Sequence, residues 1–246
     1  SYYMKLQNNN LWRGLVPPQY IYSNREFKAI AVNPPNFKPG SWTGAGKVIF
    51  DPDKDCFILT TRPRKAEGGV RGFAVEIYLS ADGENFELLT SLGKDYVSEI
   101  SDLPIKSIEG TQVLKDPLTG NWHLYLSVDT DDDFVWGGLH WQTLLLCAED
   151  LEGPWESKGL VLKNDKPYDA KHARDSTIDI IDGTWYCLYK ARDEDRFLRP
   201  ALATSSDGIN WKKQGTFTVD GKEKFIFLSG TIFAGTGNPV FIGLER

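Results

Sequence analysis

Apolar positions along the chain alternate with polar ones or gather in short runs, and turn residues separate these runs. β-Branched and aromatic side chains are frequent within them, as in Phe57–Thr60 and Trp122–Leu126. Alternation and short apolar runs are typical of β-strands, whereas an amphipathic helix places apolar residues three and four positions apart. The pattern therefore predicts an all-β protein.

The segment that begins at Arg174 and Asp175 shows the pattern most clearly. Two β-like runs flank an Asp182-Gly183 turn, which is a strong signal for a hairpin. A second turn and a closing aromatic follow at Ser205–Trp211. The segment is predicted to form four antiparallel strands.

This four-strand pattern repeats. The turn aspartates Asp51, Asp116 and Asp182 are 65 and 66 residues apart. Gly44, Glu109 and Asp175 each stand seven residues before one of these aspartates. The later turn recurs at Ser80–Phe86, Asp150–Trp155 and Asp207–Trp211. Repeats of four strands each are typical of a β-propeller.

We therefore expect residues 1–246 to form one β-propeller domain, five-bladed and incomplete or reduced at its C-terminal end. The expected blades are residues 42–89, 108–162 and 174–219, with a partial blade at 229–246. The polar, proline-containing linkers 90–107 and 163–172 are expected to be loops between blades. Residues 1–41 form an irregular segment, in which Glu26–Val32 is a candidate for a ring-closing strand.

Strand parity predicts which charges share one face of the disc. In an up-and-down blade, the start of the first strand lies at the same face as the loop between the second and third strands. Glu109 and Asp175 should therefore share a face with the loops that carry Arg62, Arg64, Asp129, Asp131, Arg192 and Asp193. The Asp51, Asp116 and Asp182 turns should lie on the opposite face. Because first strands surround the axis, these charges should converge on one funnel.

Composition and charge limit the class of protein. The chain is 41% hydrophobic and 25% charged, with a net charge of −6, which argues against a nucleic-acid partner because such proteins carry a basic face. No apolar stretch approaches the roughly 18 residues that span a bilayer, so no membrane is expected. No signal peptide is visible at Ser1–Met4, and Cys56, Cys147 and Cys187 lack metal or redox spacing. Buried reduced thiols favour a cytoplasmic location.

The repeats opening with an acid, the Arg174-Asp175 pair and the Ser-x-Asp-Gly-x-x-Trp turns resemble those of five-bladed propeller glycosidases. That group includes glycoside hydrolase families 43, 32 and 130, and the resemblance covers roughly Trp42 to the C-terminus. It implies hydrolysis of O-glycosidic bonds in an oligosaccharide or glycan by carboxylates at the starts of innermost strands. By position these are Glu109 and Asp175. Arg174-Asp175 is similar to the start of the family 32 Arg-Asp-Pro motif, with Ser176 replacing the proline.

Two departures from the family pattern leave alternatives open. Gly44 stands where families 32 and 43 have an essential aspartate, and Glu109 precedes Asp175, whereas the acid of those families usually follows the middle aspartate. The alternatives are a propeller that binds carbohydrate without cleaving it and a phosphorylase that uses phosphate. A protein-interaction propeller is the third, although the Gly-His and Trp-Asp signatures are absent.

The glycosidase hypothesis gives the two acids separate roles. Glu109 is expected to be the general acid, with its pKa raised by a neighbouring acidic loop. Asp175, next to Arg174, is expected to stay ionised as base or nucleophile. The structural alternative is that both acids cap strands around the channel.

Further residues are candidates for binding the substrate. Basic side chains there either hold an anionic group or neutralise a neighbouring acidic loop. Histidines can reach sugar hydroxyl groups, and tryptophans can either stack on a sugar ring or pack within the fold. The candidates are Arg62, Arg64, Arg174, Arg192, His140, His172, Trp42 and Trp136.

The sequence offers one candidate metal site. Asp129, Asp131 and Asp133 have the spacing of a calcium loop, but Phe134 replaces the required glycine and no glutamate stands at the twelfth position. We therefore expect no cofactor, with calcium at this loop as the one exception to test.

Overall fold

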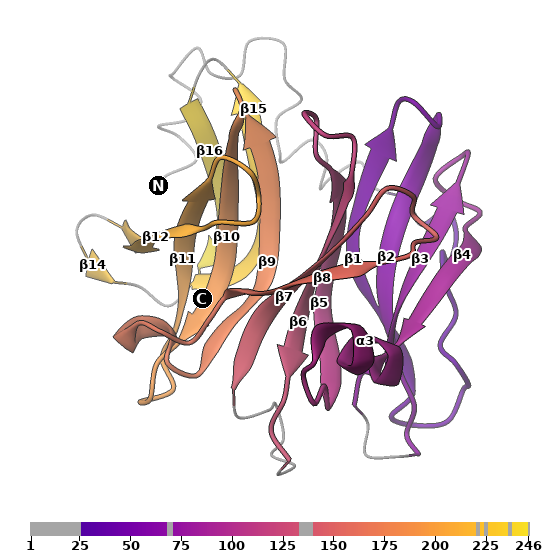
Figure 1. Ribbon diagram of the computed structural model, residues 1–246, viewed down its shortest axis with the longest axis horizontal. Helices are drawn as coiled ribbons and strands as arrows, with labels where there is room; N and C mark the ends of the chain where they lie inside the picture. The colour runs from indigo at the N-terminus through magenta and orange to yellow at the C-terminus, as the bar shows by residue number, and fades with distance from the viewer. Residues whose placement is uncertain are drawn as a thin grey trace.

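The computed structural model describes residues 26–67, 71–132, 140–219, 222–223, 226–235 and 238–245. Strands dominate these residues, and their sheets stand side by side across the molecule (Figure 1). The predicted all-β class is confirmed. Among the described residues, no helix is long and apolar enough to cross a membrane.

The first three groups of strands are four-stranded antiparallel units, which we call blades. Blade 1 consists of β1 (Trp42–Asp51), β2 (Cys56–Arg64), β3 (Ala74–Ser80) and β4 (Glu87–Gly93). Blade 2 consists of β5 (Ser107–Lys115), β6 (Trp122–Asp129), β7 (Trp141–Ala148) and β8 (Glu156–Leu162). Blade 3 consists of β9 (His172–Ile181), β10 (Thr184–Arg192), β11 (Leu198–Ser205) and β12 (Lys212–Thr216).

Blades 2 and 3 are joined into one eight-stranded sheet by a single parallel pair, Trp141 with His172. Beyond blade 3, β13 (Thr218–Val219) pairs with β14 (Lys222–Glu223), and β15 (Ile226–Gly235) pairs with β16 (Asn238–Glu245). The sheets of the described residues do not close into a ring. Five blades therefore remains a prediction.

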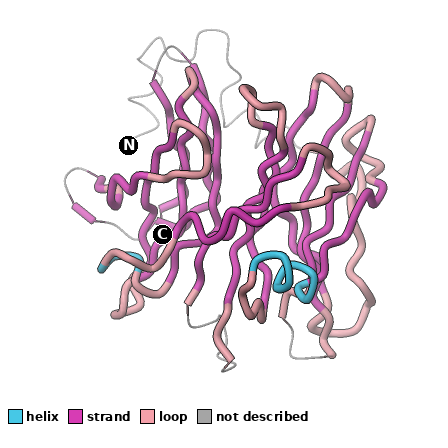
Figure 2. The backbone as a smooth tube through the Cα atoms, in the orientation of Figure 1, coloured by secondary structure: helices cyan, strands magenta, loops and turns pink. Residues whose placement is uncertain are grey.

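The first strand of each blade is the innermost one. β1 contacts β5, β5 contacts β9, and β9 contacts β15. Two hydrophobic clusters fill the spaces between blades: Ile58, Ile77 and Leu126 belong to one, and Tyr125 and Tyr189 to the other. These clusters hold the inner hairpins against one another. Figure 2 shows the strands that carry them as neighbouring layers of the backbone.

The C-terminal turns of blades 1 and 3 repeat one hydrogen-bond network. Asp82 accepts hydrogen bonds from the backbone and the side-chain amide of Asn85, at 2.8 and 2.7 Å. Asp207 accepts the same two bonds from Asn210, both at 2.8 Å. In each turn a glycine follows the aspartate with positive φ, which glycine adopts without steric cost.

Two expectations about the segments outside the blades are wrong. The linker expected at 90–107 contains α3 (Lys94–Ser101), whose Val97 is fully buried, and the next linker contains a short 3₁₀ turn, η2 (Pro167–Asp169). Glu26–Val32 forms no strand, and its Phe27 and Ile30 are exposed. No strand within the described ranges pairs with this segment, so an apolar run alone does not produce a strand.

Candidate functional site

The register of the inner hairpins places the predicted charges at one end of each hairpin. Gly44 pairs with Arg62, Glu109 pairs with Ser127, and Arg174 pairs with Lys190. Asp51 pairs with Cys56 at the opposite end of the first hairpin. The strand-parity prediction is confirmed within each hairpin, and contacts between blades join the three ends.

Glu109 is surrounded by arginines. Arg64 of β2 contacts its carboxylate directly, Arg174 Nη1 lies 3.3 Å from Oε2, and Arg62 Nη1 lies 3.8 Å from Oε1. Its side chain is 14% exposed. An acidic loop was expected beside Glu109, and residues 133–139 of that loop lie outside the described residues. Three guanidinium groups favour the ionised carboxylate, the reverse of what that expectation required.

Asp175 is held from several sides. Lys190 Nζ donates to Oδ2 at 2.6 Å, Arg174 Nε lies 3.6 Å from the same oxygen, and the backbone N–H donates to Ser127 Oγ at 2.9 Å. Burial opposes ionisation of this carboxyl, but the charges of Arg174 and Lys190 outweigh it and hold the pKa below its usual range. Asp175 therefore carries a negative charge at neutral pH, as predicted.

The backbone is irregular at both acids. The pairing of β5 with β6 shifts between Glu109 and Thr111, and Asp175 lies within the corresponding shift of β9, with φ of 53°. A side chain at Gly110 would clash with Asp175 Oδ1 and approach its Cα to 3.0 Å. Glycine is therefore required for the close approach of the two inner strands.

Arg174 connects the two acids. It contacts Glu109 of blade 2 and Asp175 of its own strand, and its guanidinium lies 4.8 Å from the centroid of the Trp141 ring. Because one guanidinium reaches both carboxylates, their separation is limited to the two contact distances plus the span of that group. The structure thus brings the two predicted acids together.

The first blade contributes cations in place of an acid. The guanidinium of Arg62 lies over Gly44, with Cζ 3.1 Å from the position of a Cβ there. The guanidinium of Arg64 lies 5.1 Å from the ring centroid of Trp42, which is half exposed at the start of β1. The space beside Gly44 is therefore occupied by Arg62.

Lys47, Lys190 and Ser127 belong to the site although they were not among the residues predicted from the sequence. The pKa of Lys47 is lowered, mainly because the side chain is buried. The charge of Asp175 opposes this shift and the charge of Lys190 adds to it, so both charges act on Lys47. The available signal was a lysine within an otherwise apolar strand, as at Tyr189-Lys190-Ala191.

His172 and Arg192 pair with each other in the β9–β10 hairpin, near the pair of Arg174 with Lys190 and at the same end. Arg192 Nη1 lies 3.3 Å from His172 Nε2, and burial, aided by the charges of Arg174 and Arg192, lowers the pKa of His172 to about 3. The neutral ring accepts at Nε2, so Nδ1 carries the proton. That buried Nδ1 has no hydrogen-bond partner.

The proposed calcium ligands bind protein groups. Asp129 contacts Arg71, and Asp131 accepts a hydrogen bond from the backbone N–H of His140 at 2.9 Å and lies 3.1 Å from its ring Nδ1. Asp133 and Trp136 lie outside the described residues. No group of three or more metal-binding side chains occurs in the described part of the chain.

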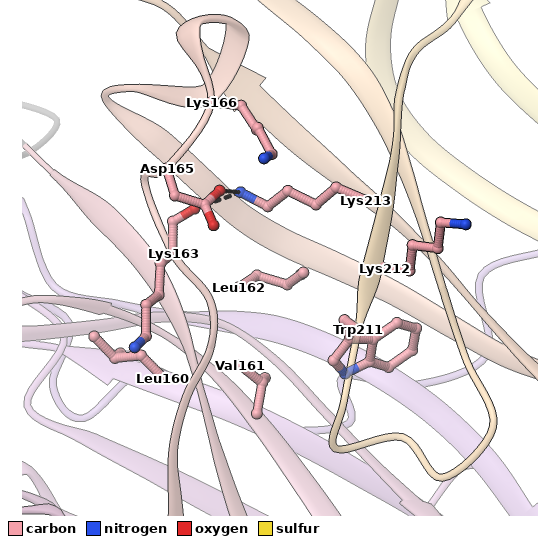
Figure 3. A pocket seen from close by; sticks show the side chains of 9 residues that line it. All are labelled: Leu160, Val161, Leu162, Lys163, Asp165, Lys166, Trp211, Lys212 and Lys213. Atoms are coloured by element: carbon pink, nitrogen blue, oxygen red, sulfur yellow. Dashed lines mark hydrogen bonds and ion pairs between the residues drawn. The ribbon is translucent and has the colours of Figure 1, made fainter.

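A separate pocket of about 420 Å³ lies on outer strands β8 and β12 (Figure 3). Lys213 crosses it and donates to Asp165 Oδ1, to Asp169 Oδ2 and to the Lys163 carbonyl, each at 2.5 Å. These bonds tie the linker after blade 2 to the last strand of blade 3. The pocket contains none of the predicted site residues.

Comparison with known proteins places the fold. No protein-family model and no curated protein matches the sequence. A family 117 glycoside hydrolase of the marine bacterium Zobellia galactanivorans has a TM-score of 0.60 and 15% identity, over 89% of this chain and 71% of that one. A family 32 β-fructofuranosidase of Bombyx mori, solved with sucrose, has a TM-score of 0.56 and 14% identity, over 84% of this chain and 43% of that one.

An exo-β-1,3-galactanase of Phanerochaete chrysosporium, solved with β-1,3-galactotriose, has a TM-score of 0.57 and 15% identity. The match covers 89% of this chain and 45% of the galactanase. The chain thus spans less than half the length of two of these proteins. Its fold is that of the propeller-type glycoside hydrolases, which confirms the predicted resemblance at the level of fold.

Proposed function

We propose that the protein hydrolyses O-glycosidic bonds of an oligosaccharide or glycan with Asp175 and Glu109 as its carboxylate pair. The observation that carries the proposal is the Arg174 contact to both acids at the axial end of neighbouring inner strands. The upper limit that this contact sets on their separation is compatible with the spacing of up to about 9.5 Å between the carboxyl groups of glycosidases.

Asp175 is the base or nucleophile in this proposal. Its lowered pKa keeps it ionised, and the hydrogen bond to Ser127 together with its left-handed backbone fixes its direction. An ionised, oriented carboxylate can activate water or attack the anomeric carbon.

Glu109 is the proton donor in this proposal. Because three guanidinium groups favour its ionised form, protonation requires that an incoming substrate displaces at least one of them. Replacing Glu109 by Gln should lower turnover of natural substrates by roughly 10²-fold or more but spare activated aryl glycosides, whose leaving groups need little protonation. Equal losses on both substrate types would remove Glu109 from the role of acid.

Binding without cleavage is the second candidate function. It is favoured by Gly44, whose neighbouring space Arg62 fills where related families carry an acid. A panel of aryl glycosides, assayed with and without phosphate, separates the candidates. Hydrolysis independent of phosphate supports the proposal, a requirement for phosphate indicates a phosphorylase, and binding of sugars without turnover indicates a binding protein.

A further inference from the structure

The axial site holds more positive than negative charge. Five cations lie around the two acids, and we call them the cation cluster: Lys47, Arg62, Arg64, Arg174 and Lys190. All five come from inner hairpins, three from blade 1 and two from blade 3. Two carboxylates neutralise two of these charges, so the site retains a positive excess although the whole chain carries −6.

Several donors of the cluster lack hydrogen-bond partners. Arg62 Nη1, Arg64 Nε and Arg174 Nε are buried without one. A buried donor without a partner is destabilising, and more so when it is charged. The side chains of Arg62 and Asp175 are nevertheless 18% and 26% exposed, so the cluster borders solvent.

Lys47 and Arg62 have the weakest contacts with carboxylates in the cation cluster. Arg62 lies 3.8 Å from its nearest carboxylate oxygen, beyond hydrogen-bond distance. Lys47 forms no ion pair within 4.0 Å among the described residues. Burial lowers the pKa of both, and with help from Arg62 and Arg174 it lowers the pKa of Arg64 to about 10. Burial is the main cause of all three shifts, and a neighbouring cation adds to each of them.

We propose that the site takes a carbohydrate bearing an oxyanion, either a uronate carboxylate or a sulfate ester, with its charge against Arg62. The inference rests on the proposed function, whose substrate class it narrows. Guanidinium groups bind carboxylate and sulfate oxygens in paired geometry, and a ligand of this kind would give Arg62 Nη1 the partner that it lacks. A neutral sugar would leave the positive excess uncompensated.

Binding of small probes to the full chain tests the inference without knowledge of the glycan. The probes are glucuronate, galacturonate, glucose 6-sulfate and inorganic phosphate, with glucose and galactose as neutral counterparts, at constant ionic strength. We expect the uronates or the sulfated sugar to bind at least tenfold more tightly than their neutral counterparts by calorimetry. Arg62→Gln should weaken that binding roughly tenfold or more, since it removes a charged hydrogen bond.

Lys158→Gln is the matched control, because it removes one positive charge from the outer strand β8. Equal losses in Lys158→Gln and Arg62→Gln would overturn the inference, as would equal affinity for charged and neutral sugars or no binding of any charged sugar. Binding of inorganic phosphate as tight as that of the charged sugars would also overturn it, in favour of a free anion. Cleavage of neutral glycosides without preference for charged ones would support the hydrolase proposal and overturn the charged-substrate inference. Binding of charged sugars without turnover would support the charged-substrate inference and overturn the hydrolase proposal.

Discussion

The repeats have stayed alike at one place and diverged at another. The C-terminal turns of blades 1 and 3 keep the same aspartate, glycine and asparagine and the same hydrogen bonds. At the axial end, the equivalent inner hairpins carry Gly44, Glu109 and Asp175, each with different partners. The shared turn serves the same structural purpose in blades 1 and 3, whereas one asymmetric site needs a different axial residue from each of three blades.

The largest expected effect is at Asp175. Asp175→Asn should lower turnover on every substrate by a factor on the order of 10³ or more, because the negative charge is lost while the size and the left-handed backbone are tolerated. Asp182→Asn is the control, since Asp182 has φ of 50° at the far end of the same hairpin. Steady-state kinetics of both variants measure the difference. Equal activity of the two variants would break the contrast between the two ends.

A smaller loss is expected at Gly110. Gly110→Ala forces Asp175 to move, so kcat should fall roughly ten- to hundredfold. The overpacked contact should also cost about 1–3 kcal/mol of stability. Gly93→Ala, where an added Cβ meets nothing within 4 Å, should change neither quantity. Kinetics and urea unfolding give the two values, and a Gly110→Ala variant with unchanged kcat would show that Asp175 does not need its present position.

At the repeated turns the effect should be on stability alone. Asp207→Ala removes hydrogen bonds to Asn210 and Ile209 and should lower the free energy of unfolding by about 1–2 kcal/mol, with kcat unchanged. Chemical denaturation measures the first quantity and a steady-state assay the second. A loss of activity at a temperature where the variant is fully folded would contradict the division between turn and axial end.

The smallest expected effect is the pH dependence of that same turn. Partial burial alone would raise the pKa of Asp207, but hydrogen bonds from Asn210 and Ile209 lower it to about 2. A lowered pKa gives stability that is complete above the unfolded value of about 3.9 and is lost as pH falls towards the folded value. The difference in unfolding free energy between the wild type and Asp207→Ala should therefore shrink by roughly 1 kcal/mol between about pH 5 and pH 3. A constant difference would show that the charge of Asp207 contributes nothing.

Local signals made the strands and the shared end of the hairpins predictable. The Asp-Gly and Asp-Pro turns fix where β9 and β5 end, and the parity of four strands places Arg62 at the end where Glu109 lies. These properties depend on residues close together in sequence.

Contacts between blades were not predictable in the same way. The three arginines around Glu109 come from β2 and β9, and their side chains meet only when the blades pack. The same limit explains α3, which follows β4 directly. Its Val97 and Ile100 do have helical spacing, but the segment is short and polar and its burial depends on the blade 1–blade 2 cluster.

The contacts of Glu109 make ligand binding at the axial site depend on the assembly of three blades. Arg64 reaches this carboxylate from blade 1 and Arg174 reaches it from blade 3, so hairpins distant in sequence converge on one side chain of blade 2. A molecule bound among these groups binds only the assembled chain. By thermodynamic linkage, a ligand at a hundredfold excess over its Kd should add about 2.7 kcal/mol to the free energy of unfolding. A bound ligand would then act as a reversible cross-link between three blades, and resistance to heat and proteolysis would follow its concentration.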